Sequence, residues 1–464
     1  MKTHDVMTGV ALAVALGLAT VSLPLHADDF AFYEVGARAA ALGGAFTAKA
    51  DDITSIFYNP AGLAFLKGLR FKTNLVISQR AISAYSAEYD RTFTSTPGTF
   101  LANIFLAWRP AKRIGLGLGY FSPYNFRSLW EDPLWVGGNS SLASKLNAQN
   151  LRAVLAVEVV KGLAVGAALD LVSLSVEWNN QVPFELGNYT LPSGTKVDCR
   201  HSLSGHGLGF TASGLWKVFP ALQVGARYQK SVTVDLAGGN AFGIPRDYSG
   251  GTVPDPYWQF RQVYSLLDFF FVPQEVTGQL TLPRQIACGI VVSPVPWLSL
   301  HLDAQWDKWS EFGRWEFRSV NADGDLNPAF TADYQEFWGV TPNYGTLGTP
   351  LTLRDTRMLK AGLEGRVGRW FTLRAGFARN ESSVEPADRN PVYPDLDRNI
   401  FSFGGGYDGP IFSIYDTEEA LGYLSIDLYI RYSAADKSPS TLPGLEFTYG
   451  AKRWVTGVGV GFSF

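Results

Sequence analysis

The sequence is poor in cysteine and methionine, with only two and three of them among 464 residues. Cys199 and Cys288 lie far apart, so they do not make a disulfide scaffold, and two free thiols are favoured over a bridge between them. The formal net charge is only −3 and no cluster of Lys and Arg is present, which argues against a nucleic-acid partner. No Ser/Pro run, charge block or low-complexity tract marks a linker between domains.

A long hydrophobic run is also missing after the N-terminus. The best candidate, Ala153–Val176, is interrupted by Lys161 and Asp170, which leave only Gly162–Leu169 uncharged between them. A helix needs ~20 apolar residues to cross a bilayer. The sequence therefore predicts no transmembrane helix, and Lys161-Gly162 is read instead as a tight turn between two strands.

Residues 1–27 have the pattern of a secretory signal peptide. Lys2 gives a positive start, an apolar stretch follows, and Ala27 stands at a plausible cleavage position before Asp28. An N-terminal membrane anchor is the alternative, and the acidic residues directly after Ala27 favour cleavage. We therefore expect a protein that functions outside the cytoplasm.

What the sequence has in abundance is glycine, aromatic residues and alternation. At the C-terminus, bulky residues of one face alternate with Gly, Ser or Val of the other; the bulky set is Trp454, Thr456, Val458, Val460, Phe462 and Phe464. This is the period of a β-strand. Elsewhere the polar face carries full charges and the apolar face carries none, which is typical of a barrel with lipid outside and a polar or mixed interior.

Such segments recur along the whole of residues 69–464 and predict an all-β transmembrane barrel of about fourteen antiparallel strands. The expected strands are 69–80, 99–109, 112–122, 148–160, 162–178, 203–217, 221–236, 276–293, 297–312, 353–367, 370–381, 399–408, 420–433 and 452–464. Some connections are very short and others long, as expected of periplasmic turns and extracellular loops. Tryptophans near the strand ends suggest interfacial girdles: Trp108, Trp178, Trp216, Trp297, Trp370 and Trp454. Closure follows because lipid cannot satisfy an unpaired strand edge.

Residues 28–68 do not alternate. They are rich in Ala and Gly and suggest short helices and turns, with Asn59-Pro60 as a punctuation point. Such a segment cannot face lipid with its turns unsatisfied. Because fourteen strands enclose more space than their own side chains fill, we expect residues 28–68 to form a plug inside the barrel.

The run from Gly36 to Ala64 resembles the N-terminal hatch of the FadL family, the outer-membrane long-chain fatty acid and hydrocarbon channels. Further motifs of that family are matched along the chain, and the terminal aromatic resembles the signal that assembly of outer-membrane barrels recognises. The matching residues are Asn59, Pro60 and Ala61 in the hatch; Pro283, Trp309, Ser310 and Phe312; Pro394, Asp395, Asp397 and Arg398; and Phe464.

The resemblance implies a passive channel in the outer membrane. External loops would capture a hydrophobic molecule, the plugged barrel would receive it, and a gap beside a kinked strand would release it sideways into the bilayer. It implies a monomer surrounded by outer-membrane lipid, which meets the barrel-assembly machinery through its C-terminal strand. A FadL-like barrel serving as partner of another envelope complex, or an outer-membrane lipase, is the alternative.

One long loop is unusually apolar, and exposed apolar patches commonly mark binding sites. Its candidate capture residues are Phe242, Trp258, Phe260, Leu266, Leu267, Phe269, Phe270 and Phe271; packing of the loop against the barrel mouth explains them as well. A fatty acid also needs a cation for its carboxylate. Arg314 and Arg318 lie near the family's basic group, although neither aligns with it, so a neutral hydrocarbon fits equally.

Other chemistry is weak. Ser204 lies between His201 and His206 but lacks the spacing of a hydrolase nucleophile, so we expect no enzyme. Asp323 and Asp325 alternate as in a calcium loop, yet Pro328 stands where such a loop needs glycine. We therefore expect neither a metal nor a cofactor.

Overall fold

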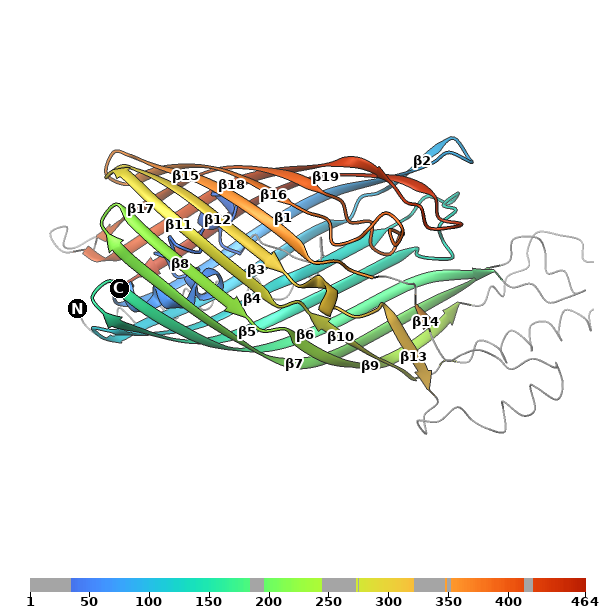
Figure 1. Ribbon diagram of the computed structural model, residues 1–464, viewed down its shortest axis with the longest axis horizontal. Helices are drawn as coiled ribbons and strands as arrows, with labels where there is room; N and C mark the ends of the chain where they lie inside the picture. The colour runs from blue at the N-terminus through green and yellow to red at the C-terminus, as the bar shows by residue number, and fades with distance from the viewer. Residues whose placement is uncertain are drawn as a thin grey trace, which may run out of the picture.

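The computed structural model describes residues 35–183, 196–243, 273, 275–320, 347–348, 352–412 and 420–464. Fourteen antiparallel strands form a closed barrel, drawn in Figure 1 as a long cylinder lying across the view. The predicted fold class is confirmed. The predicted signal peptide, residues 1–27, lies outside the described residues. Within the described ranges, no helix is both long and apolar enough to span a membrane.

Most positions in the ring are occupied by one uninterrupted strand. These are β1 (Leu69–Ser86), β3 (Gly98–Ala111), β4 (Ile114–Leu129), β5 (Ala143–Val160), β6 (Leu163–Pro183), β7 (Lys196–Phe219), β15 (Thr356–Val367), β16 (Phe371–Asn380), β17 (Arg398–Phe412), β18 (Ala420–Pro439) and β19 (Phe447–Ser463). Two short strands were not predicted: β2 (Arg91–Ser95) extends the hairpin after β1, and β14 (Leu347–Gly348) pairs with β13.

The remaining three positions hold strands that are each broken in two. They consist of β8 (Leu222–Gln229) with β9 (Val232–Gly243), β10 (Glu275–Leu282) with β11 (Gln285–Val295), and β12 (Leu298–Asp307) with β13 (Glu316–Val320). All three breaks occur at one level, because Gln285 pairs with both Gln229 and Asp307. The expectation of continuous strands was wrong here: Pro283 has no N–H for the ladder, and the short helix η2 (Trp309–Glu311) interrupts the third position.

The ring closes between its first and last strands. β1 and β19 pair without interruption from Arg70↔Ser463 to Ser86↔Phe447. Leu69 and Phe464 exchange two backbone hydrogen bonds of 3.0 and 2.9 Å, so the final residue takes part in the seam. The first and last strands therefore offer no open edge to lipid, as closure requires.

The polarity of the inner and outer faces reverses between the two halves of the barrel. We call the half with the short turns the lower half, which faces the periplasm in barrels of this kind, and the other the upper half. In the lower half of β5, Leu151 and Leu155 point outward and Arg152 inward; in its upper half, Gln149 is outside and Leu146 inside. An apolar outer face with a mixed lumen, where Arg152 shares the inner face with Val154 and Ala156, thus holds for the lower half alone. Above it, an apolar lumen is enclosed by a polar wall suited to water.

The tryptophans follow this division. Trp108, Trp216 and Trp297 are about half exposed on the outer surface near the short turns, where an interfacial girdle belongs. Trp178 was wrongly placed in that girdle: it is buried inside the upper half, and its indole N–H donates to the Ser140 carbonyl at 2.8 Å.

Candidate functional site

A small helical segment fills the lower half of the lumen. It consists of α2 (Ala37–Ala41), α3 (Ser55–Tyr58) and η1 (Pro60–Phe65), and nearly all of its described side chains are buried. We call residues 35–68 the hatch. Figure 1 shows it in blue inside the lower half of the barrel, which is the left end in that view. β1 follows directly, so the hatch is tethered to the closing seam.

Glycines in the wall let the hatch lie against the strands. A Cβ on Gly225 would collide with the Thr47 carbonyl, and one on Gly376 would collide with the backbone of Gly43. Backbone can approach this closely only where the wall residue has no side chain. The strand faces on which the sequence places glycine are therefore, at Gly225 and Gly376, the surface against which the hatch packs.

Asn59 fixes the turn between α3 and η1. Its amide nitrogen donates to the carbonyls of Thr47 at 2.8 Å and Gly214 at 3.0 Å, while its oxygen accepts from the Ala61 N–H at 3.2 Å. Pro60 occupies the first position of η1, where its missing N–H costs nothing. The Asn-Pro-Ala motif therefore links two parts of the hatch to β7.

Two wall arginines hold the carbonyl end of α3. Arg152 donates to the carbonyls of Ile56 and Phe57 at 3.2 and 3.3 Å, and Arg227 donates to the Phe57 carbonyl at 2.8 Å. Arg152 is fully buried and also pairs with Asp170 at 2.6 Å. Both guanidinium groups are thus engaged by the hatch, which leaves them unsuited to gripping a ligand carboxylate.

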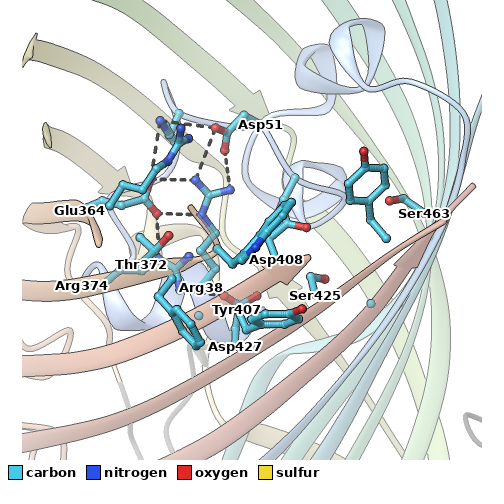
Figure 2. Close-up of a pocket in the computed structure, with 18 of the residues that line it drawn as sticks. Arg38, Asp51, Glu364, Thr372, Arg374, Tyr407, Asp408, Ser425, Asp427 and Ser463 are labelled. Carbon is cyan, nitrogen blue, oxygen red and sulfur yellow. Dashed lines mark hydrogen bonds and ion pairs between the residues drawn. The ribbon is translucent and has the colours of Figure 1, made fainter. Parts of the chain in front are cut away.

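On the opposite side, hatch and wall share a network of alternating charges. Figure 2 shows Arg38 of the hatch between Asp51 and Glu364, at 2.9 and 2.8 Å. Lys72 bridges Asp52 and Asp427 at 3.2 and 2.7 Å. Arg374 joins the two halves, because it contacts both Glu364 and Asp427. The network extends from β1 through β18 and β16 to β15.

The hatch carboxylates of this network titrate abnormally. Burial would raise the pKa of Asp52, but the nearby ammonium of Lys72 and guanidinium of Arg38 outweigh it, so the pKa lies below the ordinary value. Burial and Arg38 act on Asp51 in the same opposed way, and its pKa is lowered too. The ionised forms are therefore the stable ones inside the barrel.

The network borders a cavity of about 490 Å³ at the periplasmic mouth. Its lining is mainly charged and polar, from the hatch and from wall residues such as Arg366, Arg369 and Asp408. We call this cavity the vestibule. An apolar solute that moved downward into it could not form hydrogen bonds with its polar lining. The arrangement opposes release of such a solute along the barrel axis.

β4 leaves the wall just above the hatch. Its pairing with β3 ends at Ile104↔Tyr120, and its pairing with β5 contains a bulge between Phe121 and Tyr124. Residues 121–126 are all buried, which means that the strand dips inward there. Pro123 within the bulge has no N–H to give to a ladder. The wall is consequently unzipped between β3 and β4 at this level.

Above the hatch the lumen is lined by apolar side chains from many strands. We call this set the upper cluster; it includes Phe126, Val172, Leu203, Val234, Leu280, Trp309, Phe312, Trp315, Val392 and Tyr393. The matched residues Trp309 and Phe312 belong to it, beside the break between β12 and β13. Pro283 lies at the neighbouring break, so that both motifs mark where strands are interrupted.

The described part of the chain does not group the predicted capture residues with Arg314 and Arg318 in one site. Phe242 lies at the upper end of β9, and the other seven capture residues fall outside the described residues. Arg314 and Arg318 are exposed on the outer face of the wall, since Trp315 and Phe317 point inward, and Arg314 pairs with Glu316 at 3.1 Å. A carboxylate contact inside the lumen is therefore not supported by their position.

Several functional contacts escaped sequence reasoning, above all those of Arg38, Asp52, Lys72 and Glu364. Inward-facing charges were visible in the alternation, but their partners in the hatch were not. The structure places His201 on the inner face of β7 and both Ser204 and His206 on its exposed outer face. Cys199 and Cys288 are free, one buried in the lumen wall and the other exposed on the outer surface.

Comparisons with known proteins agree with this geometry. Residues 20–464 match the model of a family described as outer membrane protein transport protein (OMPP1/FadL/TodX). Putative outer membrane protein NMB0088 of Neisseria meningitidis serogroup B is 23% identical, over 94% of this chain and 97% of its own. A Pseudomonas aeruginosa FadL homologue superimposes with a TM-score of 0.72 at 20% identity, covering 95% of this chain and 99% of its own. The P. putida toluene transporter TodX gives 0.67 at 16%, covering 94% and 99%. The chain belongs to the OMPP1/FadL/TodX family of outer-membrane transport proteins.

Proposed function

We propose that this protein is a passive channel for the uptake of hydrophobic molecules such as long-chain fatty acids or hydrocarbons. The solute enters the apolar upper lumen and leaves sideways into the bilayer between β3 and β4. The observation that carries the proposal is the inward bulge of β4, which ends the ladder to β3 directly above the hatch.

Two further observations support a sideways exit. The axial route ends in the charged vestibule beneath the hatch, where an apolar solute is disfavoured. The outer surface beside the seam carries the apolar side chains of Ile77 and Phe100, so an apolar molecule released there enters lipid without crossing water. The name of one structural relative, a toluene transporter, fits a hydrophobic cargo.

The direct test repairs the bulge. Between Phe121 and Tyr124 the strand contains one residue more than β5 does, so deletion of Pro123 restores an unbroken register. We expect the deletion variant to assemble as a barrel yet take up radiolabelled toluene, dodecane and oleate no faster than cells without the protein.

A matched control is available in the same wall. β11 carries a bulge of the same size against β12 between Val292 and Val295, and deletion of Pro294 removes it without touching the β3–β4 seam. This control should keep wild-type uptake. Failure of the wild-type protein to import all three solutes, or normal uptake by the Pro123 deletion, would refute the proposal.

A further inference from the structure

The connection between β16 and β17 runs through the lumen instead of over the surface. We call its residues 382–397 the strap. Val384, Asn390 and Val392 are fully buried, and Tyr393 and Asp395 are nearly so. A connecting loop normally stays on the surface, where water satisfies its backbone. The burial of this one therefore calls for a reason beyond joining two strands.

Charged groups hold the strap at its base and also at Arg389, which donates to the Ser438 hydroxyl at 2.7 Å and to the Pro439 carbonyl at 3.0 Å at the upper end of β18. The Asp395 carboxylate accepts from the Ser383 N–H at 2.8 Å and from Arg398 at 3.0 Å. Asp397 accepts from the Ser382 N–H at 2.6 Å. These matched motif residues fix both ends of the strap beside β16 and β17 with charge-assisted hydrogen bonds, the stronger kind.

The tip of the strap is held differently, on the far side of the barrel. Ser128 and Trp130 donate to the Pro391 carbonyl at 3.2 and 3.1 Å, and Ser144 donates to the Val392 carbonyl at 2.6 Å. These donors belong to the upper end of β4 and the connection and strand that follow it. β18, β19, β1 and β3 separate β17 from β4 around the ring, so the strap spans the lumen.

The tip also completes the upper cluster. Val392 and Tyr393 are members of it, and the Tyr393 ring meets Phe126 edge to face, with centroids 4.8 Å apart. Phe126 lies just beyond the bulge of β4. A solute coming from the extracellular side thus meets Val392 and Tyr393 before it can reach the unzipped seam.

We propose that the strap is a second plug, an entry gate that closes the upper lumen and swings about its charged base when its tip detaches from β4 and β5. Neutral hydrogen bonds to hydroxyl and indole groups are weaker than the bonds at the base. The tip is accordingly the end that releases. The structure is the state in which both the hatch and the strap are closed.

The inference rests on the proposed function only for its uptake readout. In a background with Cys199→Ala and Cys288→Ala, the pair Ser144→Cys and Val392→Cys ties the tip to β5 by a disulfide, whose formation is checked by mass spectrometry. The pair Ser175→Cys and Ser204→Cys, opposite each other on β6 and β7, is the control, since it ties two wall strands that need not part. Oxidation should abolish uptake of toluene and oleate in the first pair alone, and reductant should restore it.

A second measurement does not depend on transport. A single Val392→Cys thiol in the purified protein should react with a water-soluble maleimide, and Ser128→Ala with Ser144→Ala should accelerate that reaction severalfold. Wild-type uptake by the fully oxidised pair, or a thiol that reacts only after unfolding, would overturn the proposal. Loss of uptake in every variant, with normal labelling kinetics, would instead count against the transport function.

Discussion

Phe57 of the hatch packs edge to face against Phe121, the last residue of β4 before its bulge, with ring centroids 5.2 Å apart. Phe121 also stacks on Phe105 of β3. One aromatic ring thus touches the hatch and both strands at the place where they part. Movement of α3 and the width of the seam are therefore expected to be coupled.

Phe121→Ala should loosen this junction. The rings of Phe57 and Phe121 are both buried, and truncating a buried Phe typically destabilises the folded protein by about 3–5 kcal/mol because a cavity remains. We expect a lower unfolding temperature in detergent and faster proteolysis of the hatch. Leu208→Ala, at a side chain 80% exposed on the outer surface, is the control and should change neither. Equal effects of both substitutions would contradict the assigned junction.

Breaking the charge network should free the hatch from one side of the wall. Lys72→Met leaves Asp52 and Asp427 without their shared cation, and a buried charge that loses its partner typically costs about 3–5 kcal/mol. Small hydrophilic dyes should then leak through liposomes that contain the variant. Lys145→Met, which removes a more exposed pair with Glu177, should remain as tight as the wild type.

Acid should weaken the same attachment. The pKa of Asp52 is lower in the folded protein than the ~3.9 of an unfolded Asp, so its contribution is complete above that value and disappears as pH falls through the folded pKa. Hatch proteolysis measured from neutral pH downward should accelerate in that acidic range. Asp52→Asn should digest faster already at neutral pH and show a flatter profile; an unchanged profile would refute the role of Asp52.

Asn59→Ala should release the turn between α3 and η1. The substitution leaves the carbonyls of Thr47 and Gly214 without their donor, and unsatisfied buried groups cost about 1–3 kcal/mol each. Hydrogen exchange at the amides of residues 55–64 should therefore be faster. Asn74→Ala, which removes an acceptor of the Ala37 N–H elsewhere in the hatch, should leave exchange in that segment as it was.

The strands were predictable because alternation is a local property of the sequence. Two-residue periodicity found the wall from Leu69 to Phe464, and its absence singled out residues 28–68. The breaks beside Pro283 and Trp309 were missed because the alternation of side chains resumes beyond them. The outward direction of Arg314 and Arg318 follows from the same two-residue period, because the apolar Trp315 and Phe317 lie between them.

The contacts that hold the hatch were beyond local reasoning. Arg38 meets Glu364 and Lys72 meets Asp427 across separations of hundreds of residues, and no periodicity encodes such pairs. The strap was missed for a similar reason, because the contacts of its tip with Trp130 and Ser144 join residues 261 and 248 positions apart.

Leu69 begins the wall directly after the hatch, and its partner is Phe464. The wall therefore closes between Phe464 and the residue that directly follows the hatch. The hatch and the closing strand β1 are thus one continuous segment of chain, so a change in the pairing of β1 with β19 acts directly on the position of the hatch.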